Sequence, residues 1–219
     1  MKRGFTLAEV LITLGVIGVV AAMTMPTLIN KFQEQVTVNK AKKFYSMMSQ
    51  AILLSMNENG YPNEWNVSDT IGPESATEFA NYIKPYLKVV KDCGTEAGCF
   101  GYTENVWRLD GTQHSVNHDT NPNYYKLILA DGSYIHIRAS NGYCKQLDTD
   151  IENVCGIITV DLNGSKAPNA FGRDIFNLYV VPTGVKTVSQ DYCNGSMSTN
   201  GWGCLSYILK NGNMDYLHK

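Results

Sequence analysis

The sequence has little net charge and few of the patterns that mark enzymes. Its formal net charge is −2 over 219 residues, so no overall basic field indicates a nucleic-acid partner. The stretch GVIGVV at residues 15–20 lies inside an apolar run and does not have the context of a nucleotide-binding loop. We find no Ser/His/Asp or Cys/His arrangement that would activate a nucleophile. The sequence therefore predicts a folded protein that is not an enzyme.

Cysteine is absent before residue 93, and the six cysteines include no Cys-x-x-Cys metal or redox pattern. They form three local couples, and nearest-neighbour pairing is the simplest of the 15 connectivities that six cysteines allow. This predicts the disulfides Cys93–Cys99, Cys144–Cys155 and Cys193–Cys204. Such bonds persist in an oxidising compartment, which places this part of the chain outside the cytoplasm. The alternative is six buried thiols in a cytosolic protein.

One long apolar run stands out against this background. Residues 5–29 contain a single ionisable side chain, that of Glu9. The run is long enough to cross a bilayer, which takes about 20 residues, but an acidic residue at mid-membrane costs roughly 2.5–3.5 kcal/mol. A secretory signal ending at Ala21-Ala22 also leaves Glu9 unexplained, and the apolar run continues past those small residues.

The stretch RGFTLAEVLITLGVIGVVAAMTMP resembles the N-terminal signal of type IV prepilins and type II secretion pseudopilins. Those families have a short basic leader that ends in Gly, then Phe, then an apolar helix with Glu as its fifth residue. The resemblance implies a leader peptide over residues 1–4, cleavage between Gly4 and Phe5, and N-methylation of Phe5. It also implies that Glu9 is an assembly residue, which meets the N-terminal amine of a neighbouring subunit and so sets the register.

The resemblance also implies a location and a set of partners. The chain would span the bacterial inner membrane once, with its N-terminus cytoplasmic and its headgroup extracytoplasmic, and would then enter a periplasmic pseudopilus or an extracellular pilus. Its partners would be like or related pilin subunits, the prepilin peptidase, an inner-membrane assembly platform and, before assembly, membrane lipid. No nucleic acid is expected.

The remaining chain predicts an α+β fold, pilin-like, in which a long N-terminal helix packs on an antiparallel β-sheet. Residues 5–29 form the transmembrane or filament-core part of the helix, with a kink at Pro26. Residues 30–59 form its amphipathic second half, and residues 60–219 form the headgroup.

Within the headgroup, local patterns predict one short helix and several strands. A capping box at Ser75-x-x-Glu78 begins the helix, and Pro85 ends or kinks it. Strands are expected on both sides of the Asp131-Gly132 turn. Further strands are expected over residues 105–109, 156–164, 174–181 and 204–217, the last turning at 211–212, and a loop is expected over residues 184–203.

Two patterns suggest metal ligands. Asp161, Asn163 and Asp174 could offer oxygens to Ca²⁺, as in some pseudopilins, but the spacing is not that of an EF-hand. A turn in which Asp and Asn bond their own backbone is the favoured alternative, so no cofactor is expected. His114 and His118 have metal spacing if they are helical, but their surroundings predict a solvated pair in a loop.

These observations predict a structural subunit of a type IV pilus or a type II secretion pseudopilus. Two alternatives stay open. One is a single-pass anchored extracytoplasmic binding protein that does not polymerise. The other is a secreted enzyme whose signal is cleaved near Met23.

Overall fold

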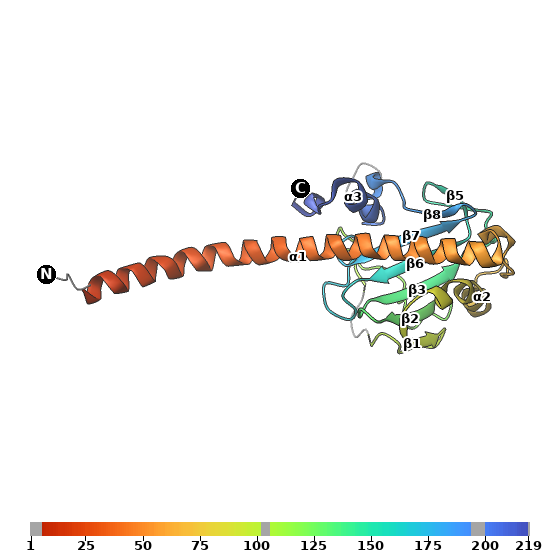
Figure 1. Cartoon of the computed structure of the whole chain (residues 1–219), viewed down its shortest axis with the longest axis horizontal. Coiled ribbons are helices and arrows are strands. Elements are labelled where there is room, and N and C mark those ends of the chain that lie inside the picture. Colours follow the sequence, from red (N-terminus) through yellow and green to blue (C-terminus); the bar gives the residue numbers. More distant parts are fainter. Residues whose placement is uncertain (1–5, 102–105, 194–199, 219) are drawn as a thin grey trace. The chain divides into compact units, whose positions relative to one another are not determined.

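The computed structural model describes residues 6–101, 106–193 and 200–218. The chain divides into two compact units, Met1–Val36 and Thr37–Lys219. The first unit contains the N-terminal part of a long helix, α1. The second contains the rest of α1 and the headgroup (Figure 1).

Helix α1 runs from Leu7 to Asn59 and keeps Pro26 inside it, so the kink stays a prediction. From Thr37 onward its buried side chains recur mainly at spacings of three and four, which places them on one face. These side chains are Val38, Ala41, Phe44, Met48, Ala51, Ile52 and Ser55. The helix ends before Gly60, whose positive φ of 78° is typical of the residue after a helix.

The headgroup is built on a six-stranded antiparallel sheet, which confirms the predicted α+β class. Its strand order is β1-β2-β3-β6-β7-β8, and a separate hairpin pairs β4 with β5. The strands are β1 (Val89–Gly94), β2 (Tyr125–Leu129), β3 (Tyr134–Ala139), β4 (Gln146–Asp148), β5 (Ile151–Val154), β6 (Gly156–Asp161), β7 (Ile175–Val181) and β8 (Gly184–Lys186). The hairpin of β2 and β3 turns at the Asp131-Gly132 pair.

Both faces of this sheet are covered. Ile158 and Leu178 belong to the main core, together with side chains of α1 and of α2 (Pro73–Ile83). Ile157 and Tyr179 alternate with them, point to the opposite face and form a second cluster. Strands β6 and β7 are therefore buried along their whole length. Helix α1 crosses only the first face, so a second layer of chain covers the other (Figure 1).

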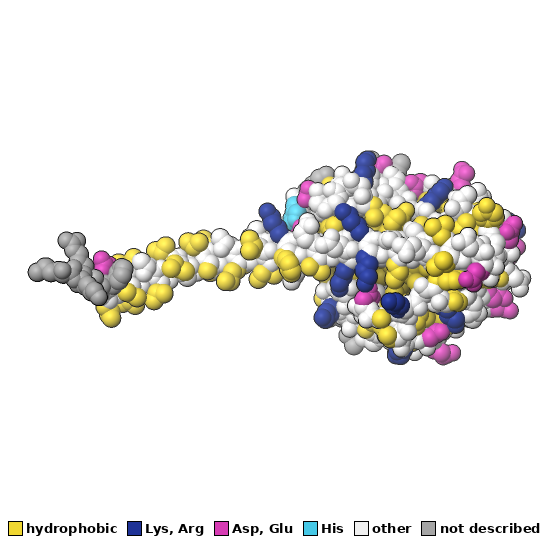
Figure 2. All heavy atoms as spheres, in the orientation of Figure 1, with side chains coloured by type: hydrophobic (Ala, Val, Ile, Leu, Met, Phe, Trp, Pro, Cys, Tyr) yellow, Lys and Arg dark blue, Asp and Glu magenta, His cyan; other side chains and the backbone are white. Residues whose placement is uncertain are grey.

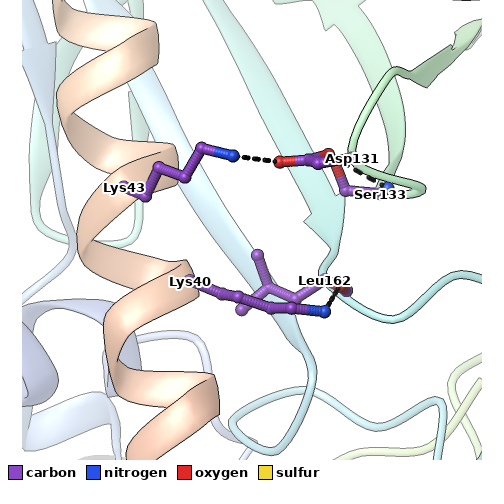
Figure 3. A network of polar contacts seen from close by, with 5 residues as sticks. All are labelled: Lys40, Lys43, Asp131, Ser133 and Leu162. Atoms are coloured by element: carbon purple, nitrogen blue, oxygen red, sulfur yellow. Dashed lines mark hydrogen bonds and ion pairs between the residues drawn. The ribbon is translucent and has the colours of Figure 1, made fainter.

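Polar contacts also hold α1 on the sheet (Figure 3). Lys40 Nζ donates to the Leu162 carbonyl at 3.0 Å, and Lys43 Nζ lies 2.8 Å from Asp131 Oδ2. Burial by itself raises the pKa of Asp131, but hydrogen bonds from Lys43 and Ser133 outweigh it and hold the pKa at about 2. Because both side chains of the ion pair are partly exposed, the pair orients the helix more than it stabilises it.

The C-terminal segment is helical, and the strand predicted over residues 204–217 is wrong. Helix α3 spans Cys204–Asn211 and is followed by the 3₁₀ helix η4 (Asp215–His218). Its buried residues Cys204, Leu205 and Ile208 lie on one helical face. Gly212, with a φ of 72°, caps the helix end and does not form a hairpin turn.

Two smaller predictions are also wrong. Residues 106–109 form no strand, since Trp107 makes only isolated bridges to Gln113 and Ala170. Ser75 is not the N-cap of α2, because α2 begins at Pro73. Ser75 Oγ instead accepts from the Gly72 N–H at 3.1 Å within the first turn, and Glu78 accepts a hydrogen bond from the Ser68 N–H.

Short 3₁₀ helices complete the headgroup. They are η1 (Pro62–Glu64), η2 (Lys84–Tyr86), which follows α2 and contains Pro85, and η3 (Gln190–Tyr192). Strand β8 and η3 lie in the predicted loop over residues 184–203, so only part of that segment is irregular. Residues 194–199 of that loop lie outside the described residues.

Candidate functional site

The N-terminus of α1 is closed by a reciprocal pair of side chains, Thr6 and Glu9. The Thr6 N–H and the Thr6 hydroxyl both donate to Glu9 Oε2 at 2.9 Å. In return, the Glu9 N–H donates to Thr6 Oγ1 at 3.3 Å. This is a capping box, in which residue N-cap and residue N3 satisfy backbone groups that have no partner within the helix. Gly4 and Phe5, the predicted processing residues, lie outside the described residues.

The capping box was recognisable from the sequence. Thr6-x-x-Glu9 directly precedes an apolar run, which is the pattern of a helix N-terminus. The resemblance to prepilins predicts a contact of Glu9 with a neighbouring subunit, whereas the capping box is a contact of Glu9 with Thr6 in the same chain. Within the chain, Glu9 has a local partner, Thr6.

Beyond this cap, the helix surface is apolar and exposed. The exposed large side chains between residues 7 and 32 are Leu7, Val10, Leu11, Ile12, Leu14, Val16, Ile17, Val19, Val20, Met23, Met25, Leu28, Ile29 and Phe32 (Figure 2). The N-terminal part of α1 is not buried, and the helix is long and apolar enough to cross a membrane. An apolar surface of this extent marks a membrane or protein contact.

Two hydroxyls on this part of the helix, those of Thr13 and Thr24, are satisfied locally. The Thr13 hydroxyl donates to the carbonyls of Glu9 and Val10 at 2.9 and 3.0 Å, and the Thr24 hydroxyl donates to the Val20 carbonyl at 2.9 Å. An unsatisfied hydroxyl would be costly in hydrocarbon. The segment can therefore sit in lipid or against neighbouring helices without leaving these hydroxyls unpaired.

Three disulfides tie the headgroup together. They are Cys93–Cys99, Cys144–Cys155 and Cys193–Cys204, with Cα separations of 5.8, 3.9 and 4.5 Å. The first links β1 to the segment that follows it, the second links the segment before β4 to the residue before β6, and the third links the residue after η3 to α3. The first and third bonds anchor a loop segment to a regular element, and the second ties the segment before β4 to the junction between β5 and β6.

The three residues considered as calcium ligands do meet, but they meet through hydrogen bonds. Asp174 accepts from the N–H groups of Asn169 and Ala170 at 2.9 and 2.7 Å and from the Asn163 amide at 3.1 Å. Asp161 Oδ1 accepts from the Asn163 N–H at 3.1 Å. Burial raises the pKa of Asp174, and these bonds offset the effect only in part. The oxygens are engaged as in the alternative turn arrangement, in which Asp and Asn bond nearby backbone.

The described parts of the chain contain no group of three or more His, Cys, Asp or Glu side chains arranged to hold a metal ion. The prediction of a solvated histidine pair is wrong, because His118 is only 3% exposed. Its ring stacks between those of His114, at a centroid distance of 5.2 Å, and His136, at 4.1 Å. His136 lies on β3, where side chains alternate between the two faces of the sheet, and this places it on the face away from α1. It was not singled out from the sequence.

Comparisons with known proteins divide the chain into two parts. A family model described as "Prokaryotic N-terminal methylation motif" matches residues 1–25. A second model, described as "Family of unknown function (DUF6613)", matches residues 27–219. No curated protein and no solved structure matches the chain. The two models meet within one residue of Pro26, inside α1.

Proposed function

This chain belongs to the family of unknown function DUF6613 and is a type IV pilin-like protein, and we propose that it is a structural subunit of a pilus or a secretion pseudopilus. One observation carries the proposal. The methylation motif continues directly into a helix whose apolar side chains are exposed from Leu7 to Phe32. Such a helix needs either lipid or other helices around it, and a pilin uses each in turn.

The proposed sequence of events begins with processing. A prepilin peptidase cleaves between Gly4 and Phe5 and the new N-terminal Phe5 is methylated, while the apolar helix stays on the mature chain. The helix then anchors the subunit in the inner membrane with its N-terminus in the cytoplasm. The disulfides support this orientation, since they require the headgroup to be in an oxidising compartment.

Glu9 has a role in both states of this subunit. An ionised carboxylate has about four acceptor positions, and Thr6 uses two of them in the isolated chain. The remaining capacity can receive the charged Phe5 amine of a neighbour. Glu9 therefore closes its own helix before assembly and pairs with the next subunit only at one axial offset.

Cohesion between apolar helices must come from packing. Lipid tails are as apolar as these side chains, so moving the helix from membrane to filament removes little apolar surface from water. Close van der Waals contacts and the Glu9 pair then determine how subunits fit. This is a structural role, and the methylation motif points to it in preference to catalysis.

The test is the amount of this protein in filaments sheared from cells. We expect Glu9→Gln to reduce the sheared fraction at least about tenfold while the membrane pool stays intact, because Gln preserves the capping pattern but cannot neutralise an amine. The control is Glu74→Gln, an exposed acidic residue in the first turn of α2. If Glu9→Gln assembles as well as the control, charge pairing is not what Glu9 supplies. If the unaltered chain never leaves the membrane, it is an anchored protein that does not polymerise.

A further inference from the structure

The charged residues of the headgroup are separated by sign along the chain. Residues 44–83 contain five acidic residues and no Lys or Arg. These acidic residues lie on α1, on η1, on α2 and on the segment before α2. Directly before this stretch, α1 carries Lys40, Lys42 and Lys43. Both signs are usually interspersed on the surface of a soluble domain, so this separation calls for an explanation.

The acidic residues gather at the end of the headgroup where α1 stops, which we call the Asn59 end. The Tyr143 hydroxyl donates to the Pro62 carbonyl at 2.7 Å, which ties η1 to the segment before β4. Lys145 of that segment lies 3.5 Å from Asp69, and both side chains are at least 65% exposed, so the pair is weak. The acidic side chains at this end are Glu58, Glu64, Asp69, Glu74 and Glu78.

The opposite end of the headgroup, which we call the Lys40 end, is basic. Lys40 contacts Leu162 and Lys43 contacts Asp131, so the loop over residues 162–174 and the β2–β3 turn lie there (Figure 3). The Tyr216 hydroxyl donates to the Gly172 carbonyl at 2.6 Å and brings the C-terminal segment to the same end. The exposed cations at this end are Lys40, Lys42, Lys43, Lys166, Arg173 and Lys210.

Acidic residues at the Lys40 end do not cancel these cations. Asp131 is paired with Lys43, and Asp161 and Asp174 are buried, which leaves Asp215 as an exposed acid on η4. In Figure 2, Lys and Arg side chains gather beside the part of α1 that enters the headgroup, and Asp and Glu side chains lie at the opposite end.

Both ends also expose large apolar or aromatic side chains. Tyr61 and Ile71 are 57% and 36% exposed at the Asn59 end. Trp107 is 39% exposed at the Lys40 end, where its N–H donates to the Asn169 carbonyl at 3.0 Å. Aromatic side chains surrounded by a polar, charged rim are typical of protein–protein interfaces.

We infer that the Lys40 end of one headgroup docks on the Asn59 end of a second copy of this chain. Opposite charges attract at this contact and like ends repel, so copies join with one polarity. Because the two surfaces differ, the contact is heterologous and can repeat along a filament. The inference rests on the proposed function, since it specifies how the headgroups of neighbouring subunits meet.

A second copy accounts for both ends, whereas other partners do not. Fifteen residues of α1 separate Lys43 from Glu58, a distance of about 22 Å along the helix. Exposed charges are largely screened beyond about 8 Å at physiological salt, so one headgroup cannot pair its own ends. An anionic lipid surface would attract the Lys40 end but would give the Asn59 end no role.

The first test is cross-linking of sheared filaments with a carbodiimide, which joins a lysine amine to a carboxylate in direct contact as an amide, with loss of water. Mass spectrometry of the digested product identifies the joined residues. We expect cross-links from Lys42, Lys166 or Lys210 to the carboxylates of the Asn59 end, and such a link must join two copies. The Lys43–Asp131 pair, 2.8 Å apart within one chain, is the positive control. If that pair is cross-linked and the two ends are not, the inference is overturned.

The second test reverses charge at each end in turn. We expect Lys166→Glu combined with Arg173→Glu to lower the sheared fraction about tenfold while the membrane pool stays intact, because like charges then face each other. Asp69→Lys combined with Glu74→Lys should do the same, whereas Glu74→Gln alone leaves four acidic residues at that end. The matched control is Lys91→Glu combined with Lys186→Glu, at exposed positions on the edge strands β1 and β8.

The outcomes separate this inference from the proposed function. If both double variants enter filaments as the control does, the headgroups do not meet through these ends, although the chain is still a filament subunit. If only the variant of the Lys40 end is impaired, that end contacts another partner, such as an anionic lipid surface, and the inference fails. If the unaltered chain never enters filaments, the proposed function fails and the inference fails with it.

Discussion

At the residue scale, the first turn of α1 depends on the Thr6 side chain. Its hydroxyl both donates to Glu9 Oε2 and accepts from the Glu9 N–H. We expect Thr6→Val to lose this cap, which is worth about 1 kcal/mol at a helix N-terminus. Amide hydrogen exchange in the first turn, from Leu7 to Val10, should become several-fold faster.

Thr6→Ser is the matched control, because serine keeps the hydroxyl and is at least as good an N-cap. Exchange farther along the helix, beyond residue 40, should be unchanged in both variants. Equal exchange rates for Thr6→Val and Thr6→Ser would show that the capping box does not hold the first turn.

The buried histidines predict that the headgroup loses stability in acid. Folding lowers the pKa of His136 from 6.5 to about 3 and also lowers that of His118. Between pH 6.5 and 3 the unfolded chain therefore binds protons that the folded chain does not. The free energy of unfolding should fall by about 1.4 kcal/mol per pH unit for each proton. Nearby groups lower these pKa values further. Lys126 and His114 do so for both His118 and His136, and Arg138 does so for His118.

Urea unfolding of the full chain at pH 7.5, 6.0 and 5.0 measures this slope. His136→Phe keeps a ring in the stack but cannot titrate, so the slope should lose one proton's contribution. A headgroup as stable at pH 5.0 as at pH 7.5 would contradict the account.

At the scale of elements, α2 and β6 approach each other at Gly156. A Cβ atom there would collide with the ring of Phe79 and the carbonyl of Arg138. Overpacking of this kind costs about 1–3 kcal/mol. We expect Gly156→Ala to lower Tm by roughly 2–12 °C, given about 2–4 °C per kcal/mol in a chain of this size.

Gly72→Ala is the control for this change. Gly72 has an extended backbone and no atom within 4 Å of a built Cβ. Its Tm should stay close to that of the unaltered protein, and thermal unfolding followed by circular dichroism compares the two. A Gly156→Ala variant as stable as Gly72→Ala would show that the Phe79 ring can move aside without cost.

The elements also show what could be predicted from the sequence and what could not. The β2–β3 hairpin was predictable because Asp131-Gly132 encodes its turn within a few residues. Helix α3 was not predictable, because its eight residues are apolar enough to fit either the period of a strand or that of a helix. Tertiary packing decides between the two. The buried position of His136 was missed for a similar reason, since the alternation of side chains along a strand cannot show that both faces of a sheet are covered.

The processing and assembly residues at the N-terminus were easier to predict than the fold of the headgroup. A fixed set of residue types at Gly4, Phe5 and Glu9 indicates a prepilin signal from the sequence alone, and the family model agrees over residues 1–25. The stack of His114, His118 and His136 could not be predicted, because these rings come from separate segments that meet only after folding. Short-range patterns are visible in one sequence, whereas pairings across the fold are not.

At the scale of the whole molecule, each part of the chain has its own physical requirement. The apolar segment of α1 needs lipid or other helices, because its side chains are exposed from Leu7 to Phe32. The headgroup needs an oxidising compartment, because it contains three disulfides. A processed, membrane-anchored subunit that later joins a filament meets both requirements.

Mass spectrometry of the mature N-terminus, on protein taken from native membranes and from sheared filaments, tests this account most directly. We predict a chain that begins at N-methylated Phe5 in both fractions, because cleavage after Gly4 precedes assembly. A chain that still begins at Met1, or one that begins near Met23, would contradict prepilin processing and with it the proposed role of Glu9.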